Sequence, residues 1–213
     1  MVCYVTSLEV GVDEAGRGPV IGPLVVCALG IPETDRGILK EIGADDSKKM
    51  TKEKRVEIYG KIVELSLKRD WKISKVVCDP ERIDETLPSE NLNSLEVKLF
   101  SEAIKGSCKS SDCKVILLDA CDVNAVRFGN GVSRELGRNW SDCEIVSDHG
   151  MDGKDVIVGA ASIVAKVIRD SEITAHDHRE WKKEHVYNGV FKAHEEEQHD
   201  WHPHCCHLAA CRC

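Results

Sequence analysis

Two strand-like segments on either side of a short glycine-rich turn constrain the fold of this chain more than any other feature. Residues 8–12 alternate between apolar and polar or small side chains, which predicts a strand that ends at Asp13 and Glu14. After the turn, residues 24–31 form an apolar run that is typical of a strand buried on both faces. The sequence therefore predicts two neighbouring strands, with two adjacent carboxylates where the first one ends.

The rest of the chain alternates strands with helices. Thr51 is the predicted N-cap of one helix, and residues 91–104 carry a second helical pattern that is expected to stop at Gly106. Three further strands are predicted at residues 73–77, 114–119 and 144–146, and a last helix begins at Val156. This order indicates an α/β domain with a mixed sheet.

Composition restricts the class of protein. The chain has 213 residues, of which 42% are hydrophobic and 31% charged, and its formal net charge is −8. This size suits one compact domain, and the absence of a long apolar run predicts no membrane span. The acidic balance disfavours a protein that coats nucleic acid with positive charge, although it is compatible with a local basic patch or with carboxylates neutralised by metal ions.

The eleven cysteines are unevenly distributed, since four of them lie in the last nine residues. Their odd number and the length of the chain argue against a secreted disulfide scaffold. The first residues lack a basic segment before their apolar positions, so no signal peptide is expected. We therefore expect a cytoplasmic protein that acts as a monomer.

The carboxylates at the strand ends are the first candidates for chemistry. A strand end or a bulge can bring Asp13 and Glu14 to one site, and Asp119, at the end of the strand at 114–119, is the obvious next member. Carboxylates that share a site repel one another and must take up protons or bind cations. Hard divalent ions, Mg²⁺ or Mn²⁺, are the natural partners, while each acid taken alone can equally be a solvated strand end.

Four ordered motifs resemble one known family. They are DEAGRG followed by PVIGPLVV at residues 13–26, DSKK at residues 46–49, LLDA at residues 117–120 and GAASIVAKVIRD at residues 159–170. Together they are similar to the motifs of ribonuclease HII, the type 2 ribonuclease H family, and they span most of the chain. A single DEAG would be weak evidence, whereas four motifs in the family's order are specific.

The resemblance implies an RNase H-like fold, in which helices flank a mixed five-stranded sheet. It implies metal-dependent endonucleolytic cleavage of RNA in RNA–DNA hybrids and on the 5′ side of ribonucleotides embedded in duplex DNA, leaving 3′-hydroxyl and 5′-phosphate ends, in DNA replication and repair. By motif position, the catalytic and metal-binding carboxylates are Asp13, Glu14, Asp119 and Asp152. Asp148 and Asp155 are close enough in sequence to be the fourth carboxylate instead of Asp152. Two ions at such a site would activate the attacking water and stabilise the departing 3′ oxygen.

Two further segments are candidates for substrate binding. In the turn formed by Gly16, Arg17 and Gly18, the glycines allow backbone groups to approach a sugar, and the family uses this turn to read the ribonucleotide. A plain tight turn is the alternative interpretation. Residues 48–72 hold nine basic and four acidic side chains, and Lys48, in the DSKK motif, is the predicted phosphate contact.

The C-terminal segment departs from the family. After about Asp170 nothing matches the tyrosine-containing segment that the family carries, and Tyr187 is the only tyrosine there. We divide the chain into an RNase H-like domain at residues 1–187 and a poorly ordered tail at residues 188–213. Zinc is the minority interpretation for the tail, whose candidate ligands are His199, His202, His204, Cys205, Cys206, His207, Cys211 and Cys213.

The sequence leaves two rival functions open. The chain can be a different two-metal nuclease, such as an exonuclease, because the carboxylates alone do not distinguish the two. It can also be a catalytically impaired protein that binds hybrids without cutting them, because its C-terminal segment departs from the family.

Overall fold

A computed structural model describes residues 7–18, 22–44 and 50–187, with side chains up to residue 175. The chain divides into two compact units, Met1–Glu172 and Ile173–Cys213. Lys48 and the tail at residues 188–213, with its predicted zinc ligands, lie outside the described residues. The predicted boundary at residue 187 and the zinc hypothesis therefore stay predictions.

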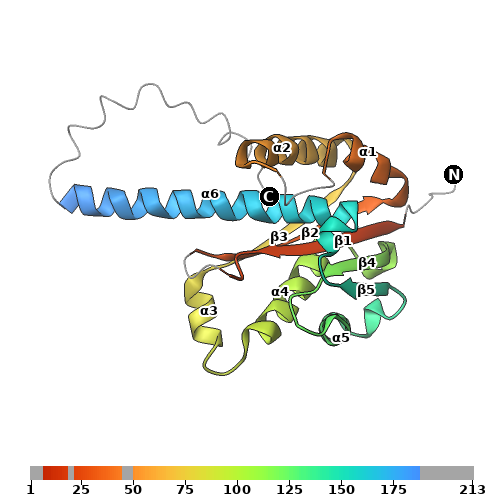
Figure 1. Cartoon of the computed structure of the whole chain (residues 1–213). Helices are drawn as coiled ribbons and strands as arrows, with labels where there is room; N and C mark the ends of the chain where they lie inside the picture. Colours follow the sequence, from red (N-terminus) through yellow and green to blue (C-terminus); the bar gives the residue numbers. More distant parts are fainter. Residues whose placement is uncertain (1–6, 19–21, 45–49, 188–213) are drawn as a thin grey trace. The chain divides into compact units, whose positions relative to one another are not determined.

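The first unit is built on a five-stranded sheet in the order β3-β2-β1-β4-β5 (Figure 1). Its strands are β1 (Leu8–Ala15), β2 (Leu24–Pro32), β3 (Lys72–Cys78), β4 (Cys113–Asp119) and β5 (Glu144–Asp148). β2 pairs antiparallel with both β1 and β3, whereas β4 pairs parallel with both β1 and β5. The predicted mixed five-stranded α/β sheet is confirmed, and all five predicted strands are present.

Helices cover both faces of the sheet (Figure 1). They are α1 (Arg36–Glu41), α2 (Lys52–Arg69), α3 (Pro80–Thr86), α4 (Leu92–Ser107), α5 (Ala125–Leu136) and α6 (Val156–Tyr187), with short 3₁₀ turns η1 (Glu33–Asp35), η3 (Ser110–Asp112), η4 (Arg138–Trp140) and η5 (Met151–Gly153). One apolar core joins α4 and α5 to one face, and a second joins α1, α2 and the first turns of α6 to the other. None of the described helices combines the length and the apolar character needed to cross a membrane.

Alternation along β1 decides which side chain meets which helix layer. Val10 and Val12 enter the core beneath α4, so Gly11 and Asp13 face α6. A Cβ on Gly11 would lie 2.6 Å from the backbone of Ile157 and of Val158. Glycine at this position therefore lets the start of α6 lie directly against β1, two residues before Asp13.

Local signals explain most helix boundaries. Thr51 caps α2 as predicted, since its Oγ1 accepts a hydrogen bond from the N–H of Lys54 at 3.3 Å. The predicted stop at Gly106 is wrong, because α4 continues to Ser107 and Gly106 does not adopt the left-handed conformation of a helix cap. A Cβ on Gly106 would lie 2.4 Å from Ser74 Oγ, so this glycine permits close packing of α4 on β3.

Helix α5 is absent from the elements predicted from the sequence. Its signals are present in the chain: Asn124 caps the helix by accepting a hydrogen bond from the N–H of Arg127 at 2.9 Å. Phe128, Val132 and Leu136 recur at four-residue spacing, and all three are buried.

Candidate metal centre

Neighbouring parallel strands bring two of the predicted carboxylates together. Val12 of β1 is in register with Leu118 of β4, so Asp13 and Asp119 follow at adjacent positions of the same sheet edge. Asp13 is only 4% exposed, and Asp119 is half-buried. The strand register thus places both carboxylates at one point without help from a loop.

The third carboxylate comes from the 3₁₀ turn that follows β5. Asp152, in η5, is 3% exposed, and ligand oxygens of Asp13, Asp119 and Asp152 all lie within 4.8 Å of one another. In the part of the chain that the structure describes, this is the one group of three or more metal-ligating side chains with such spacing. We call these three residues the aspartate triad.

The two alternative choices for the fourth carboxylate lie in other interactions. Asp148 is exposed, and its carboxylate pairs with Lys154. Asp155 Oδ2 lies 2.7 Å from Arg36 Nη1, and its Oδ1 accepts a hydrogen bond from the N–H of Ile157 at the start of α6. Of the three candidates, Asp152 is the one that the structure sets beside Asp13 and Asp119.

Glu14 lies next to the aspartate triad but faces the other helix layer. Its side chain hydrogen-bonds Cys121, in the core beneath α4, and its charge acts on Glu96 of that helix. Contact with the triad persists, because Glu14 also interacts with the carboxylate of Asp13 and raises the pKa of Asp119. Because side chains alternate along β1, Asp13 and Glu14 face opposite helix layers, although their carboxylates still interact.

Electrostatics within the triad favours a bound cation. Burial raises the pKa of Asp13 well above its ordinary value, the charge of Glu14 raises it further, and a hydrogen bond from Ser162 opposes both. Burial also raises the pKa of Asp119. The N–H of Met151 donates a hydrogen bond to Asp119 Oδ1 at 3.2 Å, and this bond lowers the same pKa. The ionised forms are thus disfavoured unless a positive charge joins them.

The donor set of the triad matches a hard divalent ion. Three carboxylates supply oxygen ligands of the kind that Mg²⁺ and Mn²⁺ prefer, with no sulfur or imidazole in the group. The residues present therefore fit the ions that the sequence predicts.

The glycine-rich turn lies directly after the strand that carries Asp13. Gly16 has a φ of +114°, and a Cβ there would lie 2.4 Å from the carbonyl oxygen of Pro23, so only glycine suits this position. A Cβ on Gly18 would meet no atom of the described residues within 4 Å, which leaves the backbone on that side open to a ligand. The guanidinium of Arg17, which the sequence places in the substrate site, is turned towards α4 and pairs with Glu96.

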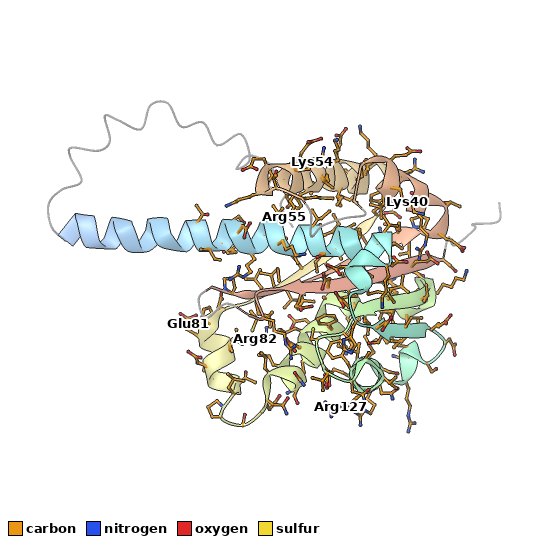
Figure 2. All side chains as sticks on the ribbon, viewed as in Figure 1. Lys40, Lys54, Arg55, Glu81, Arg82 and Arg127 are labelled. Carbon is orange, nitrogen blue, oxygen red and sulfur yellow. The ribbon has the colours of Figure 1, made fainter. Side chains whose placement is uncertain are left out.

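The basic segment is largely neutralised within the described residues. Lys54 and Arg55 belong to α2 and are labelled in Figure 2. Lys54 and Lys61 both bond Glu57, and Arg55 Nη2 lies 3.7 Å from Asp170 Oδ2. Ion pairs of this kind are typical of a solvated helix face, so the basic side chains of α2 give no support to the phosphate contact predicted at Lys48.

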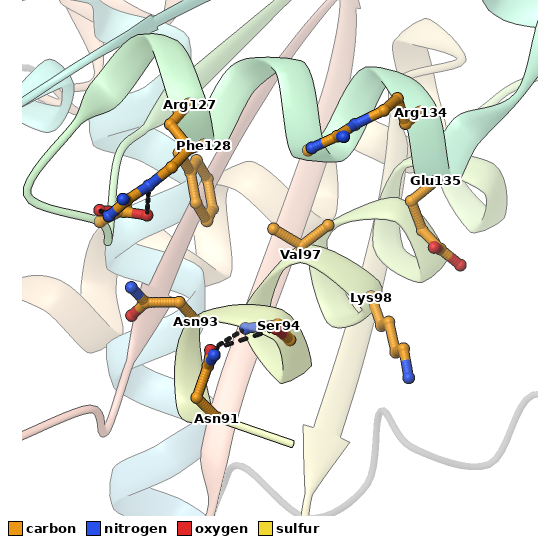
Figure 3. Close-up of a pocket in the computed structure, with 11 residues that line it drawn as sticks. Asn91, Asn93, Ser94, Val97, Lys98, Arg127, Phe128, Arg134 and Glu135 are labelled. Carbon is orange, nitrogen blue, oxygen red and sulfur yellow. Dashed lines mark hydrogen bonds and ion pairs between the residues drawn. The ribbon is translucent and has the colours of Figure 1, made fainter. Parts of the chain in front are cut away.

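A groove of about 550 Å³ runs between α4 and α5 (Figure 3). Asn93 and Lys98 line it from α4, and Arg127 and Arg134 line it from α5. Arg127 forms two hydrogen bonds with the carboxylate of Asp122, and it lies at the same end of the groove as Asn93 (Figure 3). The mixed charges of the lining do not define one ligand class.

Three residues close to the site were not among its predicted members. The first two are Ser162 and Lys166, which are four residues apart on α6 and therefore lie on the same face of that helix. Lys166 Nζ lies 2.7 Å from Ser162 Oγ and 4.0 Å from Asp152 Oδ2, so both side chains point towards the triad. The third is Glu96, whose carboxylate lies in an otherwise apolar part of α4. A charged residue inside an apolar helical stripe is the signal that could have identified it.

Comparisons with known proteins show the family to which this chain belongs. The sequence profile of the family described as Ribonuclease HII matches residues 10–198. A ribonuclease HII from Methanocella arvoryzae is 46% identical over 169 residues, which cover 79% of this chain and 70% of the relative. A ribonuclease HII from Pyrococcus furiosus is 42% identical over 165 residues, which cover 76% and 68%.

Solved structures agree with the sequence relatives. The crystal structure of the ribonuclease H2 from Pyrococcus horikoshii OT3 matches with a TM-score of 0.70 at 34% identity, covering 80% of this chain and 76% of the other. The ribonuclease HII in a complex with PCNA from Archaeoglobus fulgidus matches with a TM-score of 0.68 at 28% identity, covering 85% and 88%. On its sequence, its fold and its extended match to named relatives, the chain belongs to the ribonuclease HII family of endoribonucleases.

Proposed function

We propose that this protein is a metal-dependent endonuclease that hydrolyses the RNA strand of RNA–DNA hybrids and cuts on the 5′ side of ribonucleotides embedded in duplex DNA. It acts as a monomer and leaves 3′-hydroxyl and 5′-phosphate ends. The observation that carries this proposal is the aspartate triad, whose ligand oxygens lie within 4.8 Å of one another in a chain of the ribonuclease HII family.

Asp13, Asp119 and Asp152 are the residues that would hold two Mg²⁺ or Mn²⁺ ions, with Glu14 as a fourth carboxylate beside them. When bound, such ions supply an activated water and a positive charge at the departing oxygen. The protein's part is to fix the carboxylates in advance. Ser162 donates to Asp13, the N–H of Met151 donates to Asp119, and two of the three aspartates are almost fully buried.

The turn at residues 16–18 is the proposed contact for the ribose. Backbone N–H and C=O groups can bond a 2′-hydroxyl, which both donates and accepts, and Gly18 leaves the approach open. The turn continues the strand that carries Asp13, so a ribose held there is close to the triad. Lys48 is the proposed phosphate contact on the same substrate.

A labelled duplex with one internal ribonucleotide, and a labelled RNA–DNA hybrid, test the proposal in Mg²⁺ and in Mn²⁺. We expect one product from the first substrate, with its cut on the 5′ side of the ribonucleotide, and internal cuts in the second. An exonuclease would give a ladder, and an impaired hybrid-binding protein would retain the duplex without cutting it. Asp13→Asn should abolish cleavage and leave the circular dichroism spectrum unchanged.

A further inference from the structure

A buried carboxylate lies beside the glycine-rich turn. Glu96 of α4 is 0% exposed, and it lies on the side of the sheet towards which Glu14 points. Neither of its carboxylate oxygens has a well-aligned hydrogen-bond donor among the described residues. A carboxylate in this state is costly to bury unless a cation lies next to it.

Arg17 supplies that cation. Its Nε lies 2.8 Å from Glu96 Oε1, and its side chain is 38% exposed against 0% for Glu96. Glu14 and Asp122 also act on Glu96, and both are acids. The charge of Arg17 therefore offsets a cluster of negative charge and not one carboxylate alone.

A second contact fixes the direction of the guanidinium. Arg17 Nη2 donates a hydrogen bond to Asn93 Oδ1 at 2.7 Å, and Asn93 lies one helical turn before Glu96 on α4. Two different nitrogens of one planar group thus engage two side chains of one helix. This arrangement turns the guanidinium towards α4.

Because Arg17 lies between two glycines, its contacts with α4 determine where the turn lies. Gly16 is confined by its φ of +114° and by the carbonyl of Pro23, whereas no atom of the described residues lies within 4 Å of a Cβ on Gly18. Glycine backbone is intrinsically mobile, so the position of this turn depends on what holds the residue between the two glycines. In the described residues, Glu96 and Asn93 hold it.

We propose that Glu96 is a positioning residue, which acts through Arg17 to fix the turn at residues 16–18 against the ribose of the substrate. Arg17 is then the tether between the turn and α4, and its guanidinium is not a direct ligand of the nucleic acid. This inference rests on the proposed function of the turn as the ribose contact. It adds a buried residue of α4 to the residues that determine recognition of a ribonucleotide.

Three variants separate a tether from a direct contact. Arg17→Ala, Glu96→Leu and the double variant each remove the Arg17–Glu96 ion pair, and the two variants that lack Arg17 also lose its hydrogen bond to Asn93. Arg17→Ala should raise the KM for a ribonucleotide-containing duplex by about tenfold, Glu96→Leu should raise it by most of that factor, and kcat should change little in each. The double variant should have the same KM as Arg17→Ala, because Glu96 acts only through Arg17. Its thermal stability should exceed that of Arg17→Ala, since it no longer buries a carboxyl group that has lost its partner.

Backbone amide exchange at Gly16 and Gly18, followed by NMR, provides a readout that does not depend on catalysis. We expect faster exchange at both amides in Arg17→Ala and in Glu96→Leu. Asp35→Leu is the matched control, because Asp35 is also a buried carboxylate paired with an arginine, in η1. It should lower stability while leaving the KM and the exchange of these amides unchanged.

Two outcomes would overturn the inference. If Glu96→Leu retains the KM of the unaltered protein while Arg17→Ala raises it, Arg17 contacts the substrate itself. If the effects of the single variants multiply in the double variant, the two residues act independently. A failure of the proposed function is recognised separately, because the unaltered protein would then cleave neither substrate while the amide exchange would still report on the tether.

Discussion

At Gly11, the start of α6 packs closely on β1, and this packing keeps Asp152, just before α6, next to Asp13 of β1. The substitution Gly11→Ala tests whether this packing positions the aspartate triad. The added Cβ would lie 2.6 Å from the backbone of Ile157 and of Val158, whereas unstrained carbon contacts lie at about 3.5–4.0 Å. The obstacle is helix backbone and not a flexible side chain. The start of α6 must therefore move away from β1 by about 1 Å.

Stability and activity should both report this displacement. Overpacking of this kind costs about 2 kcal/mol, which corresponds to a decrease in Tm of roughly 4–8 °C for a chain of this size. Ser162 of α6 and Asp152, just before that helix, would shift relative to Asp13, and a misplacement of about 1 Å can reduce cleavage by about a hundredfold. Differential scanning fluorimetry and single-turnover cleavage of a labelled hybrid measure the two effects.

Gly60→Ala is the matched control for this prediction. Gly60 lies in the middle of α2, and a Cβ there would meet nothing within 4 Å. This substitution should increase stability by about 0.5–1 kcal/mol, because it removes backbone entropy from the unfolded chain, and it should leave cleavage unchanged. If Gly11→Ala has the Tm and the cleavage rate of the unaltered protein, the packing of α6 on β1 does not position the site.

Three further predictions follow from the described contacts. Arg69 and the indole N–H of Trp71 hold the pKa of the buried Asp35 at about 2, below its ordinary 3.8, so its contribution of about 2 kcal/mol is complete above pH 4 and lost as the pH falls towards 2. In urea unfolding, the free energy of unfolding of Asp35→Asn should fall less between pH 4 and pH 2 than that of the unaltered protein. An equal fall in the two proteins would contradict this prediction. Asp119→Asn should raise the Tm in the presence of a chelator, because the raised pKa of Asp119 marks a destabilised charge, and it should reduce the increase that Mn²⁺ causes in the unaltered protein. Thr51→Ala removes the N-cap of α2 and should cost about 1 kcal/mol in urea unfolding, whereas Thr51→Ser should cost much less.

The sheet and the positions of two aspartates could be predicted from the sequence because both depend on local pattern. Alternating and continuous apolar runs mark the strands, and a carboxylate after a strand lies at the edge of the sheet wherever the strand pairs. Asp13 and Asp119 needed no further information. Asp152 required the spacing of the family's motifs, because no local pattern distinguishes it from Asp148 or Asp155.

Contacts between residues that are far apart in the chain could not be predicted from local sequence pattern. Gly106 has the sequence context of a helix stop, yet its purpose is the close approach of α4 to Ser74 of β3. Arg17 is predicted from the sequence as part of the substrate-binding turn, yet a buried glutamate on α4 determines where its guanidinium lies. In both cases the decisive partner is many residues away and cannot be read from the neighbouring sequence.

The most direct test of the metal centre compares Asp152→Asn with Asp148→Asn in Mn²⁺ binding and in hybrid cleavage, on the same samples. The two aspartates are four residues apart, but only Asp152 shares the triad, whereas Asp148 is exposed and paired with Lys154. We predict that Asp152→Asn weakens Mn²⁺ binding measurably by calorimetry and reduces cleavage by at least about a hundredfold, and that Asp148→Asn retains both. Loss of binding and cleavage in Asp148→Asn, with both retained in Asp152→Asn, would contradict the assignment of the centre.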